Sequence, residues 1–139
     1  MKKTFTLLAA LCCAFLVKSQ GYVIEDGVLT SWINPPEAIT IPAEVTRIAP
    51  NVFQENKTIK MVNTNAVTEV GEFAFDGCSA LESVEMPEVK IIGQRAFRSC
   101  VNVASIDMPK IEQIGDVAFH ANNQMVEIVL PTSLQKFGS

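Results

Sequence analysis

Apolar residues recur along this chain with a fixed step of 22 residues, most visibly at the phenylalanines. Five columns of the repeat keep that step: Phe53, Phe75, Phe97 and Phe119; Ile48, Val70, Ile92 and Ile114; Val62, Val84, Ile106 and Ile128; Ala49, Gly71, Gly93 and Gly115; and Pro87, Pro109 and Pro131. The interior unit from Leu81 to Cys100 reads L-x-x-V-x-M-P-x-V-x-x-I-G-x-x-A-F-x-x-C. Self-similarity at such a period is typical of a repeat scaffold.

Each unit predicts a short strand followed by a bend and a helical turn. Residues 84–86 alternate apolar and polar side chains, which favours a strand, and Pro87 ends it because proline cannot donate to a strand ladder. Gly93 then allows a tight bend. Residues 94–99 fit one turn of α-helix or 3₁₀-helix, with Phe97 directed inward. In the preceding copy we expect the polar side chains Glu72 and Asp76 to face solvent.

A single coil of this kind has no core of its own, whereas stacked coils share one. The inward side chains of five parallel strands are expected at Ile39/Ile41, Val62/Thr64, Val84/Met86, Ile106/Met108 and Ile128/Leu130. The predicted fold is an α/β repeat solenoid, with short parallel strands on one face and short helical or 3₁₀ turns opposite. The second unit has Thr64 and Asn65 where the others have Met-Pro, so we expect a looser turn there.

The stretch before the repeats, YVIEDGVLTSW, predicts an N-terminal β-hairpin cap, because Asp26-Gly27 is a strong hairpin turn signal. Asn34-Pro35-Pro36 links it to the solenoid. We divide the chain into a secretory signal peptide at 1–19, the cap and linker at 20–36, and the repeat solenoid at 37–139. Its units have 22–23 residues, and the last unit, LPTSLQKFGS, is incomplete.

Residues 1–19 have the pattern of a secretory signal, with Lys2 and Lys3 before an apolar run and small residues at the cleavage position. We place the cut before Gln20; a lipoprotein cut at Cys12 or Cys13 is the alternative. Cleavage would remove three of the 11 basic residues and none of the 15 acidic ones, moving the net charge from −4 to −7. An acidic chain without a basic stripe is a poor candidate for nucleic acid. No later apolar run is long enough to insert into a membrane.

The repeated unit resembles the BspA-like (Treponema pallidum-type) leucine-rich repeat, and the opening hairpin and first unit are similar to that family's usual N-terminus. The resemblance covers residues 22–138. It implies a right-handed leucine-rich-repeat coil on an exported bacterial protein that is secreted, held at the cell surface or, alternatively, periplasmic. It also implies adhesion, since characterised members bind host extracellular proteins or other cells. A fold resemblance does not assign a ligand.

Four residues that could carry chemistry have simpler structural interpretations. Cys78 and Cys100 share their column with Asn56 and Asn122, so we interpret them as buried structural thiols; a disulfide, which their spacing of ~5 Å permits, and a reactive thiol are the alternatives. His120 is the only histidine and has no visible nucleophile or second metal ligand, so a solvated position is favoured. Asn56-Lys57-Thr58 matches a glycosylation sequon, but its inward column favours a structural role.

The candidate partner-binding residues are the outward positions of the predicted strands, because repeat proteins use such a face as an extended binding surface. They are Met61, Asn63, Ser83, Glu85, Ser105, Asp107, Glu127 and Val129. Three of them are acidic, but no loop supplies the several oxygens that Ca²⁺ needs. We therefore predict no catalytic residue, cofactor or metal site.

The predicted function is a non-catalytic protein-binding or adhesion module that uses this parallel-sheet face. The alternative is a structural spacer or assembly domain, including a fragment of a longer surface array, that self-associates through its uncapped C-terminal coil.

Overall fold

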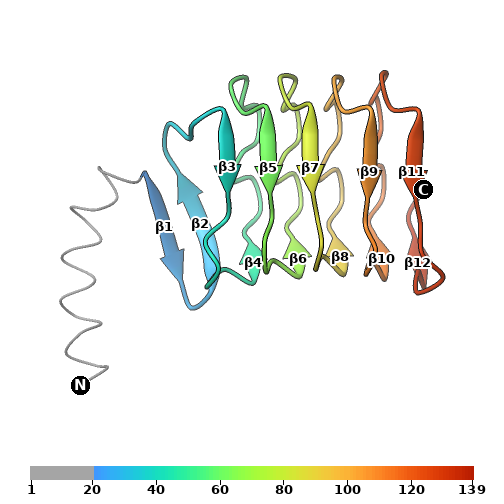
Figure 1. Ribbon diagram of the computed structural model, residues 1–139, viewed down its shortest axis with the longest axis horizontal. Coiled ribbons are helices and arrows are strands. Elements are labelled where there is room, and N and C mark those ends of the chain that lie inside the picture. The colour runs from blue at the N-terminus through green and yellow to red at the C-terminus, as the bar shows by residue number, and fades with distance from the viewer. Residues whose placement is uncertain (1–20) are drawn as a thin grey trace.

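The computed structural model describes residues 21–139, which stack into a solenoid preceded by a hairpin (Figure 1). The predicted signal peptide lies outside the described residues. The strands are β1 (Tyr22–Glu25), β2 (Val28–Trp32), β3 (Ala38–Thr40), β4 (Arg47–Ile48), β5 (Met61–Asn63), β6 (Glu69–Val70), β7 (Ser83–Glu85), β8 (Ile91–Ile92), β9 (Ser105–Asp107), β10 (Gln113–Ile114), β11 (Glu127–Val129) and β12 (Lys136–Phe137). Within residues 21–139 no helix is long and apolar enough to cross a membrane.

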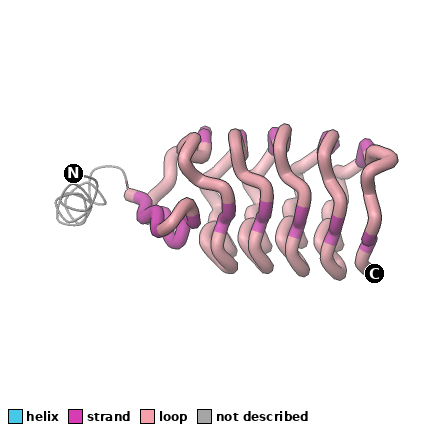
Figure 2. Tube along the Cα trace, turned by 90° about the horizontal axis from the view of Figure 1, so that it is seen from below, coloured by secondary structure: helices cyan, strands magenta, loops and turns pink. Residues whose placement is uncertain are grey.

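The solenoid carries two sheets along its length (Figure 2). The five-stranded sheet has the order β3-β5-β7-β9-β11, is parallel throughout, and occupies the strands that the alternating pattern predicts. The seven-stranded sheet, β1-β2-β4-β6-β8-β10-β12, was not predicted. Its solenoid strands are two residues long, for example Glu69–Val70, which is too short for an alternating pattern to be visible.

The N-terminal hairpin pairs β1 with β2 in an antiparallel register around the turn at Asp26 and Gly27. β2 then pairs in parallel with β4, so the hairpin continues the seven-stranded sheet. The Trp32 ring lies 4.8 Å from the Tyr22 ring and 6.0 Å from the Phe53 ring, measured between centroids. The hairpin therefore covers the first coil with aromatic rings, as a solenoid cap requires.

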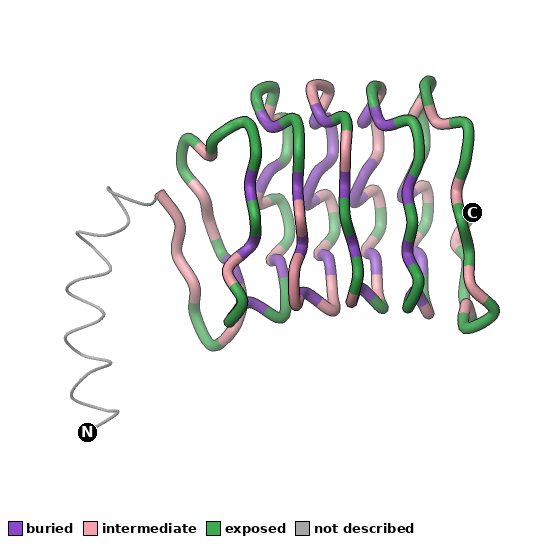
Figure 3. The backbone as a smooth tube through the Cα atoms, in the orientation of Figure 1, coloured by how far each residue is buried: buried purple, intermediate pink, exposed green. Residues whose placement is uncertain are grey.

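A column of stacked phenylalanines runs through the core. Ring centroids are 4.9 Å apart between Phe53 and Phe75, 5.0 Å between Phe75 and Phe97, and 5.8 Å between Phe97 and Phe119. Aliphatic side chains of the other columns surround them, and buried residues line the inside of each coil except the last (Figure 3). Leu130, expected to be buried, is 40 % exposed because no described coil packs on that side.

The expected helical turn is wrong: no residue from 21 to 139 is helical. In the turn after Gly71, alternate backbone N–H groups leave the coil, and those of Phe73, Phe75 and Gly77 donate to carbonyls of the next coil at 2.8–3.0 Å. Phe73 has a φ of +58°, and the same place in other coils is equally left-handed, as at Arg95 with +56°. A helix would direct every N–H back along its own coil, whereas here half of them join coil to coil.

The glycine column is set by close packing of the coils rather than by the bend we expected. Gly93 does not have a positive φ. A Cβ at Gly93 would lie 2.7 Å from the backbone nitrogen of Glu72 in the preceding coil, and at Gly115 2.5 Å from that of Gln94. Glycine is therefore needed because the backbones approach too closely for a side chain.

The turn at Thr64 and Asn65 has specific bonds and is not loose. Thr64 is fully buried, and its hydroxyl donates to the Glu85 carbonyl at 3.0 Å. Asn65 has a φ of +55°, and its side-chain amide donates to the Ile41 carbonyl at 3.1 Å. These two side chains replace the Met-Pro pair with hydrogen bonds to the coils on either side.

Candidate functional site

The eight predicted face residues all lie on β5, β7, β9 and β11. The central residue of each strand points inward and is buried on β5, β7 and β9, so the first and third residues point outward. Met61 and Val129 are large apolar side chains that remain 52 % and 49 % exposed. The structure therefore brings these residues together on one surface, which we call the sheet face.

Strand register arranges the sheet face in two columns. The first column contains Ala38, Met61, Ser83, Ser105 and Glu127, and the second contains Thr40, Asn63, Glu85, Asp107 and Val129. In the second column the Asn63 side-chain amide donates to Glu85 Oε2 at 2.9 Å. Glu85 is directly in register with Asp107 on the neighbouring strand.

The sheet face is hollowed between β3 and β7. A hollow of about 230 Å³ is lined by Ala38, Ile39, Thr40, Met61, Val62, Asn63, Ser83 and Glu85. The outward residues Ala38 and Thr40 were not among the predicted site residues. Their alternation with the buried Ile39 was the signal that could have found them.

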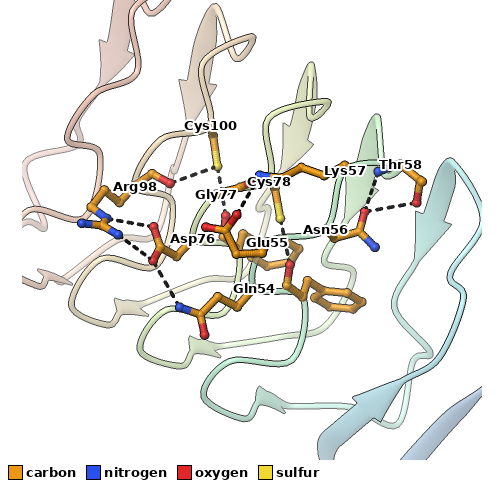
Figure 4. A network of polar contacts seen from close by, with 12 residues as sticks. Gln54, Glu55, Asn56, Lys57, Thr58, Asp76, Gly77, Cys78, Arg98 and Cys100 are labelled. Atoms are coloured by element: carbon orange, nitrogen blue, oxygen red, sulfur yellow. Dashed lines mark hydrogen bonds and ion pairs between the residues drawn. The ribbon is translucent and has the colours of Figure 1, made fainter.

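A second polar cluster lies on the turns, away from the sheet face (Figure 4). Asp76, expected to face solvent, is 1 % exposed, which corrects that expectation. The Arg98 guanidinium donates to both of its carboxylate oxygens, at 2.9 and 3.1 Å, and the Gln54 amide donates at 3.3 Å. These bonds to Asp76 raise the pKa of Arg98. The cluster joins three successive coils and has every carboxylate oxygen engaged, so it is structural.

The cysteine column behaves as the structural interpretation predicts. Cys78 and Cys100 are buried and free, and their thiols donate to the carbonyls of Phe53 and Phe75 at 3.1 and 3.2 Å. Burial raises the pKa of Cys78 to about 12, and that of Cys100 is raised for the same reason. A thiolate nucleophile is strongly disfavoured at both positions.

The remaining candidates are also structural or solvated. The Asn56 side-chain oxygen accepts from the backbone N–H groups of Thr58 and Ile59 at 2.9 and 2.8 Å, which is the structural role that we expected. His120 is exposed. Among residues 21–139 there is no group of three His, Cys, Asp or Glu side chains that could hold a metal ion.

Comparisons with known proteins agree on the repeat. The family model described as "BspA type Leucine rich repeat region" matches residues 31–139 in six copies. No curated protein matches the chain significantly.

Solved structures of bacterial leucine-rich-repeat proteins are similar to this chain. The T. pallidum leucine-rich-repeat protein is 25 % identical with a TM-score of 0.77, covering 85 % of this chain and 61 % of its own. A leucine-rich-repeat protein from Bacteroides ovatus is 28 % identical with a TM-score of 0.58, covering 76 % and 34 %. A leucine-rich cell surface protein from Faecalibacterium prausnitzii shares the fold at 19 % identity and a TM-score of 0.54, covering 81 % and 41 %. The chain thus corresponds to only part of each of these proteins.

Proposed function

The chain belongs to the BspA-type leucine-rich repeat family, and from that premise we propose that it is a non-catalytic module of an exported bacterial protein that binds a protein partner through its sheet face. The leucine-rich-repeat family that the chain matches is typically non-catalytic. The F. prausnitzii protein of the same fold is described as a cell surface protein, which supports a location outside the cytoplasm.

The observation that carries the proposal is the sheet face itself. Its outward side chains form one continuous surface that combines a hollow of about 230 Å³ with the exposed apolar side chains of Met61 and Val129. Apolar anchors inside a polar surround are the usual composition of a protein-binding surface. In the other polar cluster, both carboxylate oxygens of Asp76 are already bonded to Gln54 and Arg98.

The test places bulk on the sheet face without changing charge. The double variant Ser83→Tyr/Ser105→Tyr covers the middle of the face, and Gln94→Tyr/Gln113→Tyr adds the same side chains at exposed positions elsewhere. Binding of residues 21–139 to purified extracellular-matrix and serum proteins, and to intact bacterial cells, is measured by surface plasmon resonance and by cell binding. We expect the first variant to lose whatever binding the wild type shows and the second to keep it. Equal binding by both variants contradicts the proposal.

A second candidate function, assembly through the last coil, is favoured by a separate observation. Residues 119–139 contain no buried residue, and Val126 and Phe137 are 87 % and 56 % exposed. Phe119 and Ile128 line an almost entirely apolar hollow of about 230 Å³ at this end, which is the kind of surface on which a further coil of the same pattern packs. Sedimentation velocity tests this assembly. Association that rises with protein concentration and disappears in Phe137→Asp supports it, whereas a monomer at every concentration contradicts it.

A further inference from the structure

The outer faces of the two sheets differ in charge. The outward residues of the seven-stranded sheet include Arg47, Glu69 and Lys136, and Arg47 Nε lies 3.2 Å from Glu69 Oε2 on the neighbouring strand. The outward positions of β3, β5, β7, β9 and β11 contain Glu85, Asp107 and Glu127 and no basic residue. On the seven-stranded sheet the Glu69 carboxylate is therefore neutralised in register, whereas the five-stranded sheet leaves Glu85, Asp107 and Glu127 without an opposite charge within residues 21–139.

Glu85 and Asp107 are the centre of this imbalance. They are Cα partners on adjacent parallel strands, which lie ~4.8 Å apart. Like charges in register repel and destabilise a sheet. Among residues 21–139, Glu85 receives one hydrogen bond, from Asn63, and neither carboxylate forms an ion pair.

Two lysines next to strands of this sheet already form ion pairs with other carboxylates. Lys60, just before β5, lies 3.1 Å from Glu37 Oε2, and Lys110, three residues after β9, lies 2.7 Å from Glu88 Oε2. No basic side chain of residues 21–139 forms an ion pair with Glu85 or Asp107, so a lysine or arginine of a partner can supply the positive charge that relieves their repulsion.

The hollow adjoins this acidic pair, since Glu85 lines it together with Met61 and Asn63. Met61 offers a flexible apolar side chain that adapts to different partners. Thr40, Asn63 and Ser83 surround it with hydrogen-bonding groups. The surface therefore presents an apolar contact and a site for a cation side by side across neighbouring strands.

We propose that the sheet face binds an extended basic segment of its protein partner, an inference that rests on the proposed function. The segment crosses the strands with a lysine or arginine between Glu85 and Asp107 and an uncharged side chain in the hollow against Met61. The five strands span roughly 19 Å, which about six extended residues cover. The electrostatic contribution makes the binding sensitive to salt.

The test uses a fluorescein-labelled eight-residue peptide that alternates lysine with threonine and leucine, and matched peptides with glutamate or glutamine in place of lysine. Binding is measured by fluorescence anisotropy on residues 21–139 and two double variants. Glu85→Gln/Asp107→Asn neutralises the pair, and Glu25→Gln/Glu72→Gln removes two exposed acids outside the face. Urea midpoints check that all three proteins are folded.

We expect the lysine peptide alone to bind the wild type and the control variant. Neutralising the pair should raise its Kd about tenfold, as should an increase in NaCl from about 50 to about 500 mM. Preference for the glutamate or glutamine peptide, or an unchanged Kd in Glu85→Gln/Asp107→Asn, overturns the basic-segment inference. The proposed function stands in that case if Ser83→Tyr/Ser105→Tyr still abolishes partner binding, and both fail if that variant also has no effect.

Discussion

The phenylalanine column gives a sharp prediction about where the stability of the solenoid resides. Phe75 is fully buried and stacks on two rings, with centroids 4.9 and 5.0 Å away. Phe119 has the same place in the repeat but is partly exposed and stacks on one ring at 5.8 Å. The variants Phe75→Ala and Phe119→Ala remove the same atoms from an interior coil and from an end.

The expected costs follow from these differences. Burial of a phenylalanine side chain is worth ~1.5–3 kcal/mol, and each aromatic pair adds ~0.5–1.5 kcal/mol. Phe75→Ala should therefore lower the free energy of unfolding by about 4 kcal/mol, within the usual range for Phe→Ala substitutions. Phe119→Ala, with partial burial and one pair, should cost about 1.5 kcal/mol.

Urea unfolding of residues 21–139, followed by far-ultraviolet circular dichroism, measures both values. Trp32 fluorescence reports separately on the N-terminal end, because its ring lies next to Phe53. Coincident transitions by the two probes show cooperative unfolding. The reasoning is refuted if the two variants lose equal stability, or if Phe75→Ala costs less than about 2 kcal/mol.

Four further predictions concern individual residues of the coils. Gly93→Ala should cost about 1–3 kcal/mol in urea unfolding, because its Cβ would meet backbone 2.7 Å away; a neutral result would contradict the close packing of the coils. Cys78 and Cys100 should be inert to Ellman's reagent at pH 8 until the protein unfolds, and rapid native labelling would contradict their burial. The folded pKa of Cys78 is about 12 and its ordinary value is 9.0, so the stability that the protonated thiol contributes is present below pH 9 and is lost as the pH rises toward 12. In Cys78→Ala the urea midpoint should therefore fall less between pH 9 and pH 12 than in the wild type. Arg98→Leu should lower the urea midpoint by leaving the Asp76 carboxylate buried and unpaired, and the double variant with Asp76→Asn should recover part of it; additive losses would argue against that pairing.

The sequence predicted the repeat and the sheet face well, because both depend on columns of side chains. A period of 22 residues places Phe53, Phe75 and Phe97 in one stack, and alternation along residues 61–63 identifies which side chains point outward. The Asp26-Gly27 turn depends only on local backbone preference. None of these features requires knowledge of the distance between coils.

The misplacement of Asp76 has a different origin. A carboxylate in a turn is normally solvated, because burying a charge is costly unless an opposite charge pairs with it. That partner, Arg98, is 22 residues away, so the repeat period itself held the signal. Opposite charges spaced by one period are the pattern to look for.

The sequence by itself determined which residues share a column, because residues one repeat period apart occupy the same place in successive coils. The tertiary structure decided how adjacent coils meet. Hydrogen bonds between coils replaced the expected helical turn and joined two-residue strands into a second sheet. The close approach of adjacent backbones required glycine at 71, 93 and 115. The physical reason is that backbone N–H and C=O groups are alike at every residue. Their choice between a partner in the same coil and one in the next depends on the spacing of the stack, which no single unit specifies.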